Sequence, residues 1–352
     1  MVIRAFITHK QAESFADCQD RFGVNPDTKS IAVSDGMGST WQQKIWAELL
    51  VDTFTKRKDW NPTKESIKPL CQEWRNRVDD FIQNLKDKGA PENRIYRNER
   101  NLADGRSAGA TFVGIRFNGN DWNGSVLGDS CLIEWDGNEV KFNTSQASQT
   151  FDSYPDYFDS DASKEGKGEP KNIGGTLTEG KYLLLVSDPF SEFLSEHNKQ
   201  GNIAKHVQRL LSLSSHDDFE TLVCEWRNNG MHNDDTTLVI VENDKSENLT
   251  IEYADKIEEM ESSQISANHA IENAKTPQEN PSQEKDEAVK NFDVVQNNME
   301  DIKKEFLTEF QQFLPKRFPK QKVKLKYKWT QKVVEEVLNF LFERYYVTKK
   351  KK

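Results

Sequence analysis

Apolar residues recur along the first 245 positions with two different spacings. Short continuous or alternating runs predict β-strands, and longer stretches with apolar residues every three or four positions predict helices. The predicted strands cover residues 2–8, 21–24, 29–34, 110–117, 122–127, 131–136, 181–187 and 236–241, and the predicted helices cover 41–58, 63–87, 203–213 and 217–228. Strands and helices do not alternate as βαβ units, so the pattern favours an α+β fold with largely antiparallel sheets.

The clearest local prediction is a β-hairpin over residues 21–34. The turn-forming sequence NPDT at 25–28 separates its two strand-like runs. Because the free ends of a hairpin's strands lie beside each other, Asp20 and Asp35, which flank the hairpin, should also be neighbours.

The remaining segments have a weaker apolar pattern. We expect a polar loop over 91–108 and a long surface loop or flap over 143–175. Residues 246–300 are rich in Glu, Asn, Gln, Ser and Lys, which predicts a polar linker, in part helical. Aromatic residues return in 301–352, where we expect a small helical or mixed module. Residues 1–245 then form the main domain.

Charge is unevenly distributed along the chain, whose formal net charge is −10. Residues 301–352 contain 15 Lys and Arg against 6 Asp and Glu, whereas residues 1–300 contain 33 against 52. The acidic main domain is therefore a poor candidate for nucleic-acid binding. The basic module leaves open an acidic partner, such as nucleic acid, a lipid headgroup or a protein, with a solvated lysine face as the simpler alternative.

The cysteines and the apolar runs bear on the compartment. The four cysteines form no CxxC pair, which favours reduced thiols. The opening MVIRAFITHK has no apolar stretch of signal-peptide length, and no run is long enough to span a membrane. We therefore expect a cytoplasmic protein. The histidines form neither an HxH nor an HExxH pattern, so no zinc site is expected.

Aspartates mark the ends of several predicted strands. Three strand-like runs end in an aspartate and two more begin directly after one; these residues are Asp35, Asp129 and Asp188 at strand ends, and Asp20 and the pair Asp234-Asp235 at strand starts. In an antiparallel sheet the end of one strand lies beside the start of its neighbour. The pattern therefore predicts a group of carboxylates at one edge of the sheets.

The negative charges of such a group of carboxylates repel one another, and this repulsion has to be offset. Two like charges about 4 Å apart repel by roughly 1 kcal/mol in water and about 4 kcal/mol at an effective dielectric constant of 20. A divalent cation or raised pKa values would relieve this repulsion. Carboxylate and carbonyl oxygens favour Mg²⁺ or Mn²⁺ over zinc. For each aspartate alone, a turn or helix-cap role is the simpler alternative.

Five motifs carry a resemblance to a known family. They are CQD at 18–20, SDGMGS at 34–39, GATFVG at 109–114 followed by GDS at 128–130, LLLVSD at 183–188, and DDTTLVIV at 234–241. In this order and spacing they resemble the protein phosphatase 2C family in a divergent bacterial form. The resemblance covers residues 1–245 and implies a four-layer sandwich of two antiparallel sheets flanked by helices.

The resemblance also implies the roles of the acidic residues. Asp35 would bridge two Mg²⁺ or Mn²⁺ ions, and the Gly36 carbonyl would complete the coordination of one of them. Asp188 and Asp234 would bind the other ion. Glycine suits position 36 because the backbone must come close to an ion.

Two further aspartates have implied roles at the same centre. Asp129, together with Asp188, is a candidate for a third and weaker ion. Asp20 would act mainly through metal-bound water. Together with Asp35 and Asp234, these carboxylates would make up the catalytic and metal-binding set.

The implied activity is dephosphorylation of phosphoserine and phosphothreonine in proteins by a metal-activated water, opposing a Ser/Thr kinase or acting on its targets. The chain has no CxxxxxR phosphate loop, which argues against a tyrosine-phosphatase mechanism. The alternative is a phosphatase-like pseudoenzyme, or a phosphoprotein-binding or scaffold module whose C-terminal region recruits a partner.

The chain departs from the family pattern around the first motif. Phe15 stands where many members have a phosphate-binding Arg, and His9, Lys10 and Arg21 are all open as substitutes. Gln19 stands where an acid often precedes the first Asp, which removes one water-mediated ligand.

Three more departures lie in the later motifs. Met37 occupies the position of a His that is a proposed general acid in some eukaryotic members, so water would protonate the leaving group. Pro189 replaces a usual Gly and Asp235 replaces a usual Asn. None of the three removes an expected metal ligand.

Overall fold

The computed structural model describes residues 1–145, 155–164, 166–246 and 248–261. Most of the predicted linker and the whole of the predicted basic module at 301–352 lie outside these residues, so these two assignments stay predictions. Among the described helices, none combines the length and the apolar character that crossing a membrane requires.

The larger sheet of the described chain has six strands in the order β13-β1-β12-β11-β7-β8. Its strands are β1 (Val2–Thr8), β7 (Cys131–Trp135), β8 (Val140–Asn143), β11 (Tyr182–Val186), β12 (Thr236–Glu242) and β13 (Thr250–Ala254). All neighbours are antiparallel except β1 and β13, which run parallel.

The second sheet has five strands in the order β10-β6-β5-β3-β2, and every pair is antiparallel. Its strands are β2 (Arg21–Asn25), β3 (Ser30–Ser34), β5 (Phe112–Asn118), β6 (Asp121–Leu127) and β10 (Lys171–Thr176). A short two-stranded sheet joins β4 (Gly109–Ala110) to β9 (Phe158–Asp159). The predicted hairpin is confirmed as β2 and β3, in which Arg21 faces Ser34.

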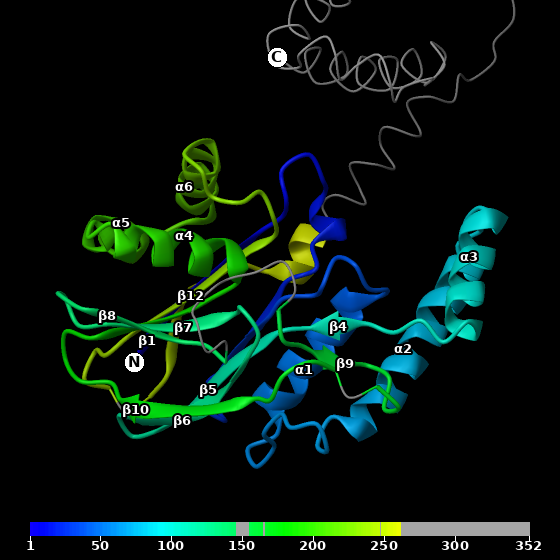
Figure 1. The fold of residues 1–352 in the computed structure, drawn as a ribbon, viewed down its shortest axis with the longest axis horizontal. Helices are drawn as coiled ribbons and strands as arrows, with labels where there is room; N and C mark the ends of the chain where they lie inside the picture. The colour runs from blue at the N-terminus through cyan, green and yellow to red at the C-terminus, as the bar shows by residue number, and fades with distance from the viewer. Residues whose placement is uncertain (146–154, 165, 247, 262–352) are drawn as a thin grey trace, which may run out of the picture. The chain divides into compact units, whose positions relative to one another are not determined.

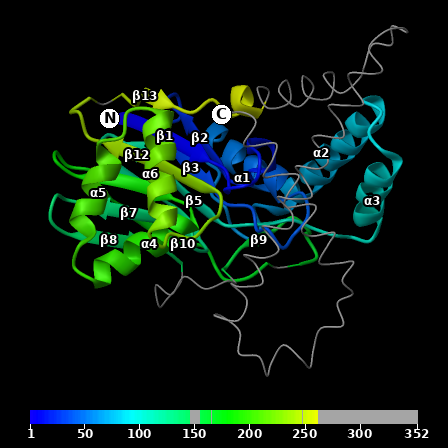
Figure 2. The same ribbon diagram turned by 90° about the horizontal axis from the view of Figure 1, so that it is seen from above.

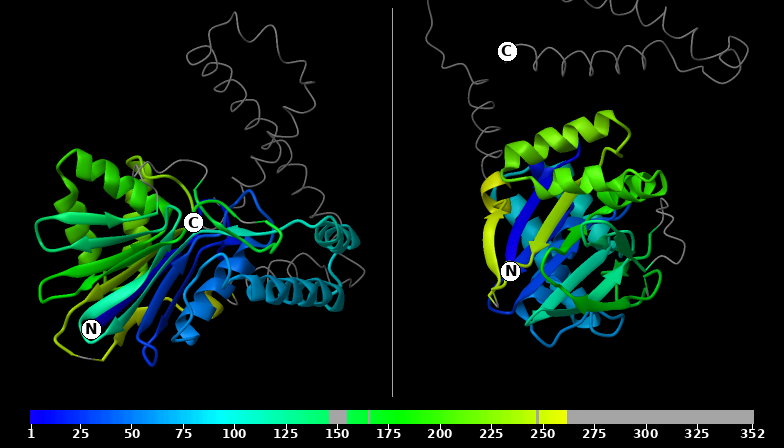
Figure 3. Two further views of the ribbon diagram at one scale, coloured as in Figure 1. Left: turned by 60° about the horizontal axis from the view of Figure 1, so that its bottom comes forward. Right: turned by 90° about the vertical axis from the view of Figure 1, so that its left-hand side faces the viewer.

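The two larger sheets lie face to face between helices (Figures 1 and 3). Helices α4 (Asp188–Lys199), α5 (Ile203–Leu211) and α6 (His216–Asn228) cover the six-stranded sheet. Helices α1 (Gln43–Lys56) and α2 (Lys68–Asp87) lie on the side of the five-stranded sheet. The predicted four-layer sandwich of two antiparallel sheets flanked by helices is confirmed.

Three apolar cores separate the four layers. The middle core joins the sheets through residues such as Ile3, Val33 and Leu185, all fully buried. The alternation of apolar residues along the strands puts every second side chain into this layer, while the remaining apolar residues face the helices. Burial at about 25 cal/mol per Å² of apolar surface makes these cores the main source of stability.

Helix α1 sits close against the second sheet. Its residues Trp46, Leu50 and Phe54 are fully buried in the core that it shares with α2. Gly23 in β2 permits this approach, because a Cβ at that position would lie only 2.6 Å from Cγ1 of Val51. The helical spacing predicted over 41–58 is thus confirmed as a packed face.

Two predicted loops contain regular structure instead. Residues 91–108, expected to be a loop, contain α3 (Glu92–Ala103), which lies beside α2 at the side of the sheets (Figure 2). This helix buries none of its residues, so it has no apolar stripe that could reveal it. The predicted flap at 143–175 contains the start of β10, in which only Ile173 is buried.

The fold continues beyond the expected boundary at residue 245. Strand β13 belongs to the segment assigned to the linker, yet it pairs with β1 and extends the six-stranded sheet. Asp255, which follows β13, is buried and accepts hydrogen bonds from the Ile7 backbone N–H at 2.8 Å and the Tyr253 hydroxyl at 2.7 Å. His216 Nδ1 lies 3.0 Å from the same carboxylate, and this hydrogen bond helps raise the pKa of the His216 imidazole to about 10. The start of the assigned linker is therefore fixed to the sheet.

Candidate active site

Strand register brings the aspartates of the six-stranded sheet to one end of that sheet. Val186, the last residue of β11, faces Cys131 at the start of β7 and Leu238 near the start of β12. The chain passes directly from β11 into Asp188, and it enters β7 just after Asp129. Both carboxylates therefore lie at the same edge of the sheet, as the sequence predicted.

The second sheet brings its own pair to the same region. Asp20 and Asp35 flank the hairpin of β2 and β3 at its open end. The Thr237 hydroxyl, on β12 of the first sheet, donates a hydrogen bond of 2.7 Å to Oδ2 of Asp20. This bond joins the two sheets where their acidic ends meet.

The acidic residues surround a single cleft with a volume of about 740 Å³. Its lining includes Asp35, Gly36, Asp129, Asp188 and Asp234. Asp20 lies behind the lining and is fully buried. The structure thus brings together all six residues that the sequence analysis assigned to the metal centre.

The electrostatics of this group are unfavourable without a cation. Burial raises the pKa of Asp20 well above its usual value, and the charge of Asp35 raises it further. Burial, followed by the charges of Asp188 and Asp129, raises the pKa of Asp35 in the same direction. The pKa of Asp188 is likewise raised by burial and then by Asp129 and Asp20. Each carboxylate therefore makes ionisation of its neighbours more costly.

The donor atoms suit a hard divalent cation. Oδ1 of Asp20 is buried and has no hydrogen-bond partner among the described residues, which is costly for a polar atom. Gly36 keeps the backbone accessible, since a Cβ there would lie 3.0 Å from the Gln19 carbonyl oxygen. Closely spaced carboxylates and an accessible backbone carbonyl are the kinds of oxygen ligand that Mg²⁺ and Mn²⁺ bind.

A family model provides the decisive comparison. The model described as protein phosphatase 2C matches residues 9–245, which cover all the elements that build the cleft from its first loop to β12.

The chain belongs to the protein phosphatase 2C family.

Several solved structures are similar to this chain at low sequence identity. A serine/threonine phosphatase of S. agalactiae is 18% identical, with a TM-score of 0.43 over 68% of this chain and 98% of that one. The phosphatase Stp1 from Staphylococcus aureus is 15% identical, with a TM-score of 0.44 over 68% and 93%. The catalytic domain of PstP, solved with two manganese ions, is 15% identical, with a TM-score of 0.42 over 68% and 96%. The comparison with curated proteins found no match.

The structure distinguishes the three candidates for the missing phosphate-binding arginine of the family. Arg21 is 3% exposed and donates to the Asp20 carbonyl and to Glu261, so its guanidinium does not line the cleft. His9 makes an edge contact with Phe15, which is itself buried. Lys10 lines the cleft, with Nζ 3.4 Å from Oδ1 of Asp234.

Asp235 has a structural role that sequence reasoning missed. In place of the usual asparagine of the family, its two carboxylate oxygens accept hydrogen bonds from the backbone N–H groups of Lys10 at 2.8 Å and Gln19 at 2.7 Å. An asparagine has one acceptor oxygen in its side chain and could satisfy only one of these donors in this way. Asp235 therefore fixes two segments of the cleft wall to the start of β12.

The first turn of α4 holds Asp188 in place. Ser187 precedes the helix and accepts a hydrogen bond from the Thr237 backbone N–H at 2.9 Å. The Ser191 hydroxyl donates to the Asp129 carbonyl at 2.8 Å, which ties α4 to the loop before β7. Pro189 fits because the first turn of a helix does not use its backbone N–H groups.

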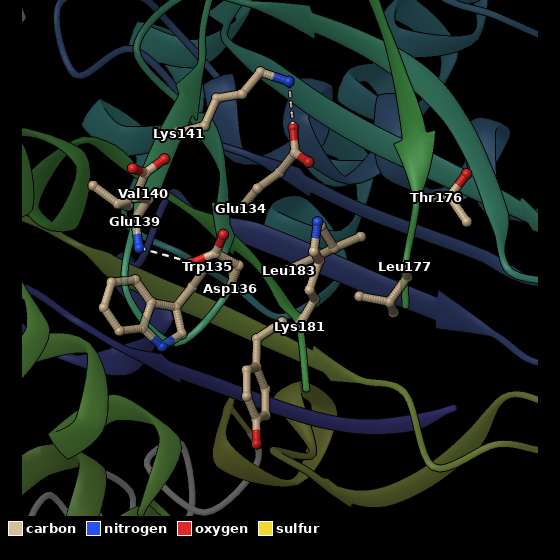
Figure 4. A pocket seen from close by; sticks show the side chains of 11 residues that line it. Glu134, Trp135, Asp136, Glu139, Val140, Lys141, Thr176, Leu177, Lys181 and Leu183 are labelled. Atoms are coloured by element: carbon tan, nitrogen blue, oxygen red, sulfur yellow. Dashed lines mark hydrogen bonds and ion pairs between the residues drawn. The ribbon is translucent and has the colours of Figure 1, made fainter. Parts of the chain in front are cut away.

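A second cavity, at the other end of the sheets, lacks comparable chemistry (Figure 4). It has a volume of about 190 Å³ and lies between the β7–β8 hairpin and the start of β11. Lys141 pairs with Glu134 at 2.6 Å, and Asp136 accepts a hydrogen bond from the Glu139 backbone N–H. Lys141 and Glu134 neutralise each other and backbone N–H groups bind Asp136, unlike the clustered carboxylates of the acidic cleft.

Repulsion within the cleft predicts that Asp35→Asn stabilises the protein in the absence of divalent ions. The pKa of Asp35 is raised in the folded state, so its ionisation destabilises the fold increasingly as pH rises above the unfolded value. We expect the variant to gain roughly 1–4 kcal/mol at pH 7 and little near pH 3, as measured by urea unfolding with a chelator.

Asp27→Asn, an exposed carboxylate in the turn of the hairpin, provides the matched control and should leave stability nearly unchanged. A metal-free Asp35→Asn protein that is less stable than the wild type at pH 7 would contradict the repulsion.

Proposed function

We propose that this chain is a metal-dependent serine/threonine protein phosphatase that uses two Mg²⁺ or Mn²⁺ ions held by the acidic cleft. The observation that carries the proposal is the convergence of Asp35, Asp188 and Asp234 on one cleft in a protein phosphatase 2C fold. In this assignment Asp35 would be a ligand of both ions, and Asp188 and Asp234 would hold the second one. Asp129 and Asp188 would hold a third ion, and Asp20 would act through water.

The divalent ions, when bound, polarise the phosphoryl group and supply a strong nucleophile from water at neutral pH. The chain's own residues provide the rest of the catalytic environment. The two sheets hold the carboxylates rigidly, so no side-chain reorganisation is required as charge develops. Met37 lines the cleft and has no titratable proton, so it cannot serve as a general acid, and solvent is proposed to protonate the serine or threonine oxygen.

Lys10 is proposed to bind the substrate phosphate. Among the described residues that line the cleft, it is the one lysine, and no arginine lines it. Its backbone is fixed by Asp235, and its ammonium group lies at the cleft with about a third of its side chain exposed. An exposed ion pair with Asp234 at 3.4 Å is weak, so a phosphate can attract Lys10 without a large cost.

The biological setting remains part of the proposal. The partner is a phosphoprotein, and the reaction opposes a Ser/Thr kinase in the cytoplasm. None of the four cysteines forms a disulfide, which suits a reducing compartment. The predicted basic module at 301–352, outside the described residues, is proposed to recruit a partner.

Hydrolysis of a phosphothreonine peptide tests the catalytic assignment. We expect Mn²⁺-dependent turnover by the wild type, and losses of at least about 100-fold in kcat for Asp35→Asn and Asp188→Asn, because electrostatic groups of a reaction centre contribute on this scale. Asp27→Asn should retain full activity. A wild type no faster than Asp35→Asn would favour the pseudoenzyme or binding module instead.

If Lys10 binds the substrate phosphate, removing its charge should lower kcat/KM, and the conservative variant Lys10→Arg should lower it less. Lys10→Gln should lower kcat/KM for the phosphopeptide by about 10- to 100-fold, while Lys10→Arg should lose less, since a charged hydrogen bond contributes about 1.5–3 kcal/mol. Affinity for Mn²⁺ should not fall in either variant. Equal kcat/KM for Lys10→Gln and the wild type would show that another group binds the phosphate.

A further inference from the structure

The acidic cleft contains an imidazole that is not part of the expected metal site. His232 lies on the loop between α6 and β12 and lines the cleft beside Asp188 and Asp234. One ring nitrogen of His232 and one carboxylate oxygen from each aspartate all lie within 4.8 Å of one another. Ligands at about 2.1 Å from one cation are at most about 4.2 Å apart, so small side-chain rotations would let one ion contact all three.

The backbone around His232 is fixed on its N-terminal side. Gly230 adopts φ +105°, a conformation that favours glycine, and lets the chain turn back at the end of α6. The Met231 backbone N–H donates to the Trp226 carbonyl at 2.9 Å, and the Met231 side chain is 4% exposed within the core under α4 and α6. His232 is left exposed at the cleft.

The C-terminal side of the loop is fixed as well. The Gln11 backbone N–H donates to Asn233 Oδ1 at 2.9 Å, and Nη2 of Arg227 donates to the Asp234 carbonyl at 2.6 Å. His232 therefore sits on a loop that is anchored on both sides, within reach of two carboxylates. A preorganised position of this kind is what a metal ligand requires.

The ring nitrogens of His232 are available for a ligand. Neither forms a hydrogen bond with another described residue, whereas Nδ1 of His197 lies 2.9 Å from Asn202 Oδ1 and Nδ1 of His216 contacts Asp255. Imidazole nitrogen is a good ligand for transition metals, while Mg²⁺ binds oxygen ligands and retains water.

We propose that His232 is a nitrogen ligand of the ion held by Asp188 and Asp234, so that this position selects a transition-metal ion such as Mn²⁺ over Mg²⁺. The inference rests on the proposed function only in that the same two carboxylates bind a divalent ion. The charge of Lys10, whose Nζ lies 3.4 Å from Oδ1 of Asp234, repels both ions alike, so the selection comes from the nitrogen ligand. The nitrogen ligand adds affinity that depends less on the net negative charge of the site.

Direct metal binding tests this ligand without relying on activity. Wild type, His232→Gln and the control His197→Gln are titrated with Mn²⁺, Co²⁺ and Mg²⁺ by calorimetry. We expect His232→Gln to lower the affinity of one site for Mn²⁺ and Co²⁺ by about 10- to 100-fold. Its affinity for Mg²⁺ should change by less than about threefold, since oxygen ligands dominate there. His197→Gln should match the wild type.

Histidine-labelled protein gives a second, site-specific readout. Co²⁺ bound to the His232 imidazole should shift its NMR resonance strongly, and His232→Gln identifies that resonance. Wild-type affinities for Mn²⁺ and Co²⁺ in His232→Gln would overturn the proposal while leaving metal binding by the carboxylates intact. A wild type that binds no divalent ion would overturn this proposal and the proposed function together.

Discussion

The electrostatic repulsion among the clustered carboxylates is the constraint on which the rest of this structure depends. Asp20 is fully buried, Asp35 and Asp188 are half-buried at the same cleft, and neighbouring carboxylates raise the pKa of each of the three. Such an arrangement persists only where other interactions fix the backbone. Here the two sheets and three apolar cores fix it, and the proposed divalent cations would turn the repulsion into binding energy.

Along each strand, different residues form the apolar cores and the acidic site. The apolar residues of β11 and β12 pack between layers, and the residues just beyond the strand ends carry the charge. Hydrogen bonds from Thr237 to Asp20 and from Ser191 to the Asp129 carbonyl join elements that are distant in sequence. The site is thus assembled by register and by a few buried hydroxyl groups.

Much of this arrangement could be predicted because it is encoded locally. An aspartate at a strand end keeps its place whichever strand pairs with it, so the six expected residues meet as predicted. Helix α3 and strand β10 could not be predicted, because α3 has no fully buried residue and β10 buries a single isoleucine, which leaves no periodic apolar signal. Helix α4, which begins at Asp188, was not predicted, because the strand-like run that precedes it was the stronger signal.

Residues whose roles depend on tertiary contacts could not be identified from the sequence. Arg21 and Lys10 were equal candidates in the sequence, and only the packing shows that Arg21 is buried against Glu261 while Lys10 reaches the cleft. The role of Asp235 depends on two backbone N–H groups far away along the chain. The proximity of His232 to Asp188 has no signature in their spacing.

Anomalous diffraction from crystals grown with Mn²⁺ tests the central claim most directly. If the carboxylates are held together to bind divalent ions, manganese peaks should lie in the cleft in contact with Asp35, and with Asp188 and Asp234. Ordered side chains at these three positions with no manganese among them, at a concentration that supports maximal binding, would contradict the claim.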